Sequence, residues 1–265
     1  MGDLIYKPLI DDMTWSYSRI KTFFDCPYRF FLKYIHGTKE KDMFYSNYGK
    51  FMHNLIDKYI SGQISRENMK IEYILNFDRM VKGIKPSEKT VIRYFEDGVN
   101  YINNISDMPF DRIATEKFYK FKIDGEKFVG VIDFLGKKDD DLYIVDHKSK
   151  IIKPRSKNKN ATTSNNCLDE MLMQLYIYSE PVLEEFGRYP KELCFNCFRN
   201  GTLVREKFDE NRFYNSKNWV TDSINEIKNC DEFNPKIDYY KCNYICGLNL
   251  QCEYYKTVFP NKREG

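Results

Sequence analysis

Two acidic residues and a lysine near the middle of the chain have a spacing that suits metal-dependent hydrolysis. Asp133, Asp146 and Lys148 each follow apolar residues typical of a strand. Because side chains alternate along a strand, Asp146 and Lys148 are predicted to share one face, and a hairpin turn brings Asp133 beside Asp146. Two neighbouring carboxylates repel each other unless a cation lies between them, and oxygen ligands favour Mg²⁺ or Mn²⁺. Such a cation polarises a phosphoryl oxygen and activates a water that Lys148 can orient.

The alternative for this motif is a surface salt bridge between Asp146 and Lys148, which is the usual role of an isolated Asp-x-Lys pair. Its neighbours Ile132, Ile144 and Val145 are apolar. These apolar neighbours favour a strand with one buried face over a strand that is exposed to solvent on both faces.

The elements that must position these residues follow from hydrophobic periodicity. Apolar residues at helical spacing predict helices over 16–36, 45–61, 65–80, 87–104 and 210–229. Pro27 is expected to kink or restart the first of these helices. Alternating patterns predict strands over 113–123 and 126–136, joined by an Asp124-Gly125 turn, and over 141–148, 192–198 and 203–208. The polar segment 149–166 is predicted to be a loop, followed by a helix from 167 to about 186 that Asn166 caps.

This element order predicts an α/β fold with a mixed central β-sheet flanked by helices. We expect one domain over 1–265. It divides into a mainly helical part (14–112), a catalytic sheet with its crossover helix (113–208), and a final helix with a cysteine-rich tail (209–265).

Composition narrows the class of protein. Hydrophobic residues make up 42% of the 265 residues and charged residues 31%, which is typical of a globular chain, and the net charge of +3 does not by itself indicate a nucleic-acid binder. The first fifteen residues lack an apolar core and no run of eighteen apolar residues occurs, so we expect no signal peptide, no membrane span and a cytoplasmic protein. In that reducing setting, clustered cysteines among the eight are expected to bind metal.

Several motifs in order resemble one family. G-x-x-D at Gly130–Asp133, a hairpin, and D-x-K at Asp146–Lys148 are similar to the catalytic core of the PD-(D/E)XK nucleases, in particular their RecB-like, AddB-like and CRISPR-associated exonuclease branch. Gly49–His53 resembles the G-x-x-x-H motif of that branch, Gln174–Tyr178 its Q-x-x-x-Y motif, and Cys26-Pro27 its opening. The resemblance covers residues 14 to 255 and implies a restriction-endonuclease-like core.

The resemblance also implies roles for single residues. The metal would be held by His53, Asp133, Asp146 and the backbone carbonyl of His147, and Lys148 would position the attacking water. Glu116, Gln174 and Tyr178 would lie in a second shell or contact DNA. From the residues alone, His53 can equally be a packed helix histidine, Gln174 and Tyr178 a polar stripe, and Glu116 an ordinary strand residue.

Four cysteines at the two ends of the chain form a second candidate centre. Cys242, Cys246 and Cys252 give the spacing C-x₃-C-x₅-C. In the RecB-like branch, one early cysteine, here Cys26, and three late ones hold a [4Fe–4S] cluster that staples the chain ends. The usual tail there is C-x₂-C-x₅-C, one residue shorter. Structural zinc and unligated thiols are the alternatives. Cys194 and Cys197 are three apart on a predicted strand, which favours two buried core thiols.

A basic loop follows the proposed catalytic lysine. It carries Lys150, Lys153, Arg155, Lys157 and Lys159, with no acidic residue between 147 and 168. Such a loop can follow a phosphate backbone. The alternative is a solvated loop without a partner.

These observations predict a metal-dependent DNA nuclease. The resemblance implies an exonuclease that hydrolyses phosphodiester bonds of single-stranded DNA or DNA ends, in recombination, repair or phage or CRISPR DNA processing, with a helicase or a recombination or CRISPR protein as partner. No P-loop occurs, so ATP use is not encoded in this chain. The alternatives are a non-catalytic DNA-binding adaptor on the same scaffold and an iron–sulfur electron carrier.

Overall fold

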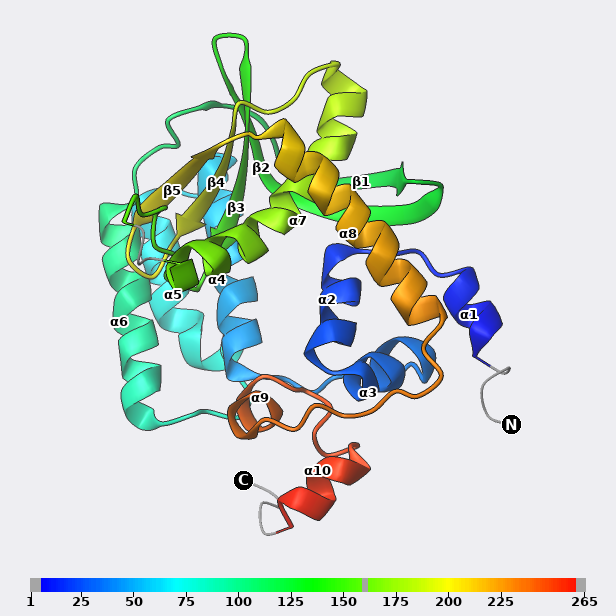
Figure 1. Ribbon diagram of the computed structural model, residues 1–265. Helices are drawn as coiled ribbons and strands as arrows, with labels where there is room; N and C mark the ends of the chain where they lie inside the picture. Colours follow the sequence, from blue (N-terminus) through cyan, green and yellow to red (C-terminus); the bar gives the residue numbers. More distant parts are fainter. Residues whose placement is uncertain (1–5, 159–161, 261–265) are drawn as a thin grey trace.

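A five-stranded mixed sheet forms the centre of the computed structural model, which describes residues 6–158 and 162–260 (Figure 1). The strand order is β1-β2-β3-β4-β5. The strands are β1 (Asp111–Ile123), β2 (Glu126–Lys138), β3 (Asp141–Lys148), β4 (Glu192–Cys197) and β5 (Thr202–Lys207). Only the β3–β4 pair is parallel, and the crossover helix α7 (Thr162–Phe186) joins its two strands. The predicted fold class, a mixed sheet flanked by helices, is confirmed.

The first two of the sheet's three hairpins form where the turn residues predict them. Asp124 and Gly125 have φ of 48° and 87°, which a two-residue hairpin turn requires, and Asp139 at the next turn has φ of 55°. In the β2–β3 pair, Phe134 lies opposite Val145. Continuing that register by one residue sets Asp133 opposite Asp146, as the alternation predicted.

Helices surround the sheet. They are α1 (Lys7–Asp11), α2 (Tyr17–Asp25), α3 (Pro27–Phe30) with the π-helical turn η1 (Phe31–Ile35), α4 (Phe44–Ile60), α5 (Arg66–Met80), α6 (Glu88–Asn104), α8 (Glu210–Lys228), α9 (Tyr239–Tyr244) and α10 (Glu253–Val258). The larger apolar core packs α2, α7 and α8 against one face of the sheet, and a second core is formed within α4–α6. Alternate strand residues, among them Tyr143 and Val145, pack on the other face beside Ile60 of α4.

Two predicted helices differ in their bounds. The helix predicted over 16–36 restarts at Pro27, as expected, because the proline ring disfavours helical geometry in the preceding residue and Cys26 is extended (φ −165°, ψ 105°). The helix predicted from 167 starts at Thr162, so Asn166 lies inside it and is not its cap. The Asn165 side chain instead bonds the backbone of Ser156 and ties the preceding loop to the first turn.

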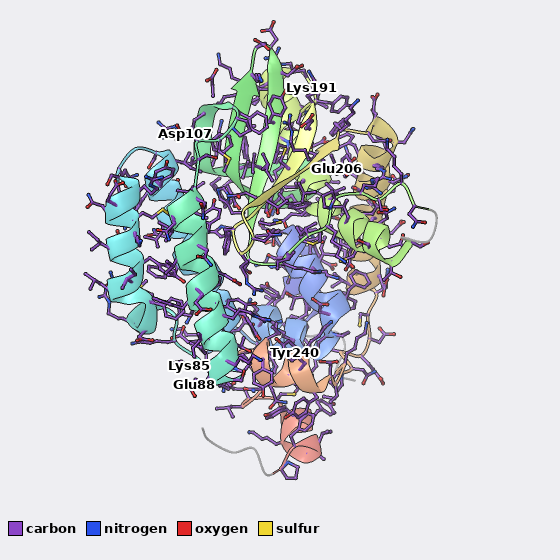
Figure 2. All side chains as sticks on the ribbon, turned by 90° about the vertical axis from the view of Figure 1, so that its left-hand side faces the viewer. Lys85, Glu88, Asp107, Lys191, Glu206 and Tyr240 are labelled. Carbon is purple, nitrogen blue, oxygen red and sulfur yellow. The ribbon has the colours of Figure 1, made fainter. Side chains whose placement is uncertain are left out.

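The early helix α3 lies beside the C-terminal helices α9 and α10 below the sheet (Figure 1). The hydroxyl of Tyr28 in α3 donates to Glu253 of α10 at 3.0 Å, and the rings of Tyr28 and Tyr254 are in edge contact. The hydroxyls of Tyr240 in α9 and Tyr45 in α4 are also hydrogen-bonded, and Figure 2 shows Tyr240 at this lower end. The tail therefore contacts both the first helices and α4.

Gly98 in α6 gives a test of how α6 packs against Tyr73 of α5. Alanine normally stabilises a helix interior by about 1 kcal/mol relative to glycine. At Gly98, however, a Cβ would lie 2.2 Å from the hydroxyl oxygen of Tyr73, which donates to two backbone carbonyls of α6. We expect Gly98→Ala to lower the free energy of unfolding by about 1–3 kcal/mol in urea titrations. Gly49→Ala in α4 is the control, because no atom lies within 4 Å of its Cβ, and it should stabilise.

Candidate functional site

Three carboxylate residues form a row across the first three strands. Asp133 of β2 lies opposite Asp146 of β3, and the β1–β2 register sets Glu116 of β1 opposite Asp133 on the other side. Glu116 has φ of 45°, a left-handed conformation that a non-glycine residue in a strand adopts only at an energetic cost. Ligand atoms of Glu116, Asp133 and His53 all lie within 4.8 Å of one another. The sheet and α4 thus place one imidazole and two carboxylates close enough to share a cation.

His53 of α4 reaches the sheet through the backbone of His147. Its Nε2 lies 2.6 Å from the carbonyl oxygen of His147, and its Nδ1 lies 3.5 Å from Oδ2 of Asp133. Burial lowers the pKa of His53, against the opposing charge of Asp146, so the ring is neutral and carries one proton. With Nε2 donating to the carbonyl, Nδ1 presents a lone pair to the carboxylate. A lone pair facing a carboxylate is repulsive unless a cation lies between them.

Asp146 is buried and the side chain of Asp133 is 10% exposed, so both carboxylates are largely removed from water. Burial, and then the charge of Asp146, raises the pKa of Asp133 well above its ordinary value. The backbone N–H of His147 donates to Asp133 at 2.7 Å. Asp146 is 4% exposed, and its Oδ2 accepts no hydrogen bond, although the ammonium of Lys148 lies 2.6 Å away as an ion pair. One ammonium beside these two carboxylates leaves a net negative site that fits a divalent cation.

Gln174 and Tyr178 of α7 complete the polar network, one helical turn apart. Lys148 Nζ donates to Gln174 Oε1 at 3.1 Å, and Gln174 Nε2 donates to the Tyr178 hydroxyl at 3.3 Å. Burial raises the pKa of Tyr178 to about 12, so its hydroxyl stays protonated. Gly130 makes room for the ring, since a Cβ there would lie 2.5 Å from it. The Q-x-x-x-Y residues therefore orient Lys148.

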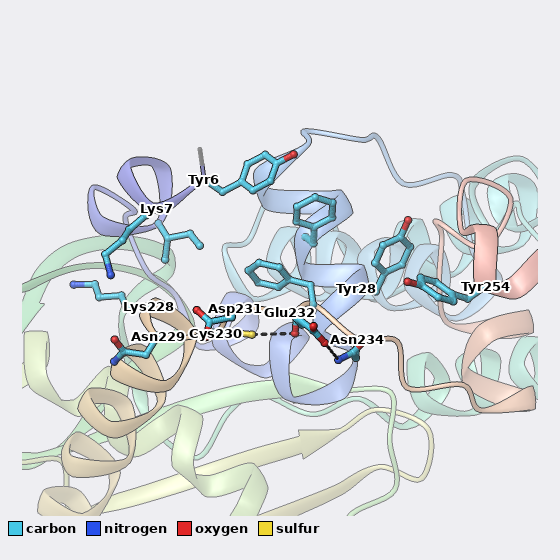
Figure 3. Close-up of a pocket in the computed structure, with 13 residues that line it drawn as sticks. Tyr6, Lys7, Tyr28, Lys228, Asn229, Cys230, Asp231, Glu232, Asn234 and Tyr254 are labelled. Atoms are coloured by element: carbon cyan, nitrogen blue, oxygen red, sulfur yellow. Dashed lines mark hydrogen bonds between the residues drawn. The ribbon is translucent and has the colours of Figure 1, made fainter. Parts of the chain in front are cut away.

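A cavity of about 530 Å³ opens onto this site along one face of α4. It is lined by Tyr45, Ser46, Gly49, Lys50, His53, Asn54, Asp57 and Glu116. Sequence reasoning missed Asp57, although it follows His53 by one helical turn and that spacing alone puts both residues on the same face. A larger cavity of about 690 Å³ lies between α1, α3 and the end of α8 (Figure 3), and contains none of the proposed metal ligands.

The basic loop offers fewer free charges than its composition suggests. Arg155 forms ion pairs with Asp169 of α7 and Glu206 of β5, so it anchors the loop. Lys150 Nζ lies 3.2 Å from the sulfur of Cys167. Lys150, Lys153 and Lys157 are exposed, whereas Lys159 lies outside the described residues.

The four cysteines from the two chain ends line one small cavity, together with Arg29 and Asn249. Backbone N–H groups approach two of the sulfurs, from Lys236 to Cys26 at 3.5 Å and from Tyr255 to Cys252 at 3.4 Å. Burial raises the pKa of Cys246 to about 11, while the nearby Arg29 acts in the opposite direction. Elsewhere, Cys194 and Cys197 are fully buried in different cores on the two faces of β4, as their spacing predicted.

Comparisons with known proteins agree with this geometry. The sequence profile of the PD-(D/E)XK nuclease superfamily matches residues 14–253. A crystal structure from Eubacterium rectale, described as a "putative exonuclease", superposes with a TM-score of 0.53 at 12% identity, covering 98% of this chain and 92% of that one. At that identity the likeness concerns the fold alone. No curated protein is similar enough to count as a match. Within the described part of the chain, none of the helices is long and apolar enough to cross a membrane.

Proposed function

The chain belongs to the PD-(D/E)XK nuclease superfamily, and we propose that it is a divalent-metal-dependent deoxyribonuclease of the RecB-like branch, an exonuclease acting on single-stranded DNA or DNA ends. One observation carries the proposal. Two carboxylates that are largely removed from water, Asp133 and Asp146, lie side by side, with the ammonium of Lys148 beside Asp146 and the lone pair of His53 facing Asp133. A decayed, non-catalytic scaffold has no need to keep this costly arrangement.

The residues that would hold the metal are His53, Asp133, Asp146 and the carbonyl of His147. Ligand atoms of His53, Asp133 and Glu116 lie within 4.8 Å of one another, and Asp146 lies opposite Asp133 in the sheet. An imidazole among oxygen ligands suits Mn²⁺ better than Mg²⁺. When bound, the cation supplies Lewis-acid activation of the phosphoryl group and of the attacking water.

Side chains of the protein would orient the attacking water, balance the developing charge and bind the DNA backbone. Lys148, held by Gln174 and by its pairing with Asp146, places its ammonium where it can orient water and balance charge that develops on the phosphate. Lys50 on the cavity wall and the exposed Lys150, Lys153 and Lys157 supply positive charge for the DNA backbone.

The experiment is cleavage of labelled single- and double-stranded DNA with Mg²⁺, Mn²⁺ or a chelator, using the wild type and Lys148→Met. We expect metal-dependent release of nucleotides by the wild type, and a kcat lowered about 10²- to 10⁴-fold in the variant, because the substitution removes the ammonium beside the carboxylates. Mn²⁺ binding should persist, since Lys148 is not a ligand. Metal-independent cleavage, or DNA binding without turnover in the wild type, contradicts the proposal, and the second outcome favours an adaptor.

We further propose that Cys26, Cys242, Cys246 and Cys252 hold a [4Fe–4S] cluster. Four thiolates lining one cavity can hold either a [4Fe–4S] cluster or tetrahedral zinc. The neighbouring Arg29 and the N–H groups that approach sulfur suit an anionic cluster, whose potential such contacts tune.

A further inference from the structure

His147 connects two of the proposed metal ligands through its backbone. Its N–H donates to Asp133 at 2.7 Å, and its carbonyl oxygen accepts from His53 at 2.6 Å. The orientation of the peptide groups on either side of His147 therefore sets where the carboxylate and the imidazole lie. In an active site, a displacement of about 1 Å can lower the rate about 10²-fold.

The side chain of His147 lies on the face of β3 opposite Asp146 and Lys148 and is 2% exposed. Asn196 is its cross-strand neighbour in the parallel β3–β4 pair. The Nδ2 atom of Asn196 lies 3.0 Å from Nδ1 of His147 and donates to the hydroxyl of Tyr101 at 2.7 Å. The His147 ring is thus tied both to β4 and, through Tyr101, to α6.

An asparagine at this place in a strand is costly. Asn196 is 6% exposed and lies between Phe195 and Cys197, both fully buried. A buried amide costs free energy unless it is hydrogen-bonded, so an apolar residue would fit the strand at less cost. Both amide hydrogens of Asn196 are used, one for the His147 ring and one for Tyr101. These two contacts account for the presence of the amide.

The direction of the contact fixes the His147 ring. Because the amide donates to Nδ1, the neutral ring carries its proton on Nε2.

We infer that Asn196, supported by Tyr101, is a positioning residue that holds the His147 ring and, through the His147 backbone, the Asp133 and His53 ligands. The inference rests on the proposed function. It adds Asn196 and Tyr101, which lie on the face of the sheet opposite Asp146 and Lys148, to the residues that support the site.

The test compares two variants. Asn196→Leu keeps the size of the side chain but removes its hydrogen bonds to His147 and Tyr101, whereas Tyr101→Phe removes only the hydroxyl that accepts from Asn196. Asn104→Ala is the matched control, because Asn104 lines the same cavity of about 470 Å³ as Asn196 and Tyr101 but does not touch His147. The chain has three histidines, so ¹⁵N-histidine spectra resolve the His147 ring. Mn²⁺ affinity is measured by electron paramagnetic resonance, and kcat and KM are measured on DNA.

For Asn196→Leu and Tyr101→Phe we expect shifted His147 signals, Mn²⁺ affinity lowered about 10- to 100-fold, and a lower kcat with KM for DNA unchanged. Asn196→Asp can only accept from the ring, so it should move the proton to Nδ1. Asn104→Ala should match the wild type.

Unchanged His147 signals and Mn²⁺ affinity in both variants would overturn the inference. If Asn196→Leu does not fold, Tyr101→Phe decides. If the wild type cleaves no DNA while the variants still shift the His147 signals and lose Mn²⁺ affinity, the proposed function fails and the positioning role stands.

Discussion

Asp146→Asn is expected to abolish DNA cleavage and to weaken Mn²⁺ binding, with kcat lowered about 10³-fold or more. The substitution keeps the shape of the side chain but removes a charge from the site. It leaves His53, Asp133 and the His147 carbonyl, with Glu116 within reach, to hold the cation. The measurements are nuclease assays at saturating metal and calorimetric titration with Mn²⁺.

The metal-free Asp146→Asn variant should not be less stable than the metal-free wild type, even though it loses an ion pair. In the wild type, burial and the charge of Asp146 raise the pKa of Asp133. The folded protein therefore holds that proton more tightly than the unfolded chain, so stability falls as the pH rises through the raised pKa. Without the charge of Asp146, the pKa of Asp133 moves back toward its ordinary value. The variant therefore loses less stability than the wild type as the pH rises. Thermal unfolding between pH 4 and 8 measures the difference.

Asp141→Asn is the matched control, since Asp141 lies on the same strand, is exposed and pairs with Lys191 away from the site. It should leave both cleavage and Mn²⁺ affinity unchanged. Full cleavage by Asp146→Asn, or an equal loss in Asp141→Asn, would contradict the assignment of the site.

The central part of this site was predictable from the sequence because it depends on short-range rules. A two-residue hairpin and the period of two in a strand suffice to bring Asp133 beside Asp146 and to put Lys148 on the same face. One helical turn suffices to place Gln174 with Tyr178. In each case, the residues that decide the geometry lie within a few positions of the residues they place.

Other parts depend on long-range geometry that local patterns do not carry. The approach of Glu116 to Asp133 and His53 requires the β1–β2 register after an irregularity between Arg112 and Ala114. The charge of Arg155 counted toward a DNA-binding loop, yet its partners Asp169 and Glu206 come from two other elements. In the sequence, Asn196 is one polar residue in an apolar strand. Only the parallel pairing of β3 and β4 places it beside His147.

Loss of a cluster ligand is expected to have the largest effect on stability. Cys246→Ser should remove iron and visible absorption from protein purified without oxygen, and should lower the melting temperature by about 10 °C or more. The reason is topological, because the proposed cluster joins Cys26 to three cysteines near the other end of the chain. A cross-link that closes a loop of more than 100 residues stabilises by about 4–5 kcal/mol in the chain-entropy model. Iron content, absorption spectra and calorimetry measure the three effects.

Cys230→Ser is the control, because Cys230 is also half-buried and near the chain end but lies outside the four-cysteine cavity. Its iron content and melting temperature should match those of the wild type. Loss of the proposed cluster should also affect the candidate active site. The tail that carries Cys242 also carries Tyr240, whose hydroxyl forms a hydrogen bond with Tyr45 on the wall of the α4 cavity. Loss of the cluster should therefore lower cleavage as well as stability, whereas Asp146→Asn should leave iron content intact. A colourless wild type with stoichiometric zinc, or a Cys246→Ser protein that melts like Cys230→Ser, would contradict the cluster.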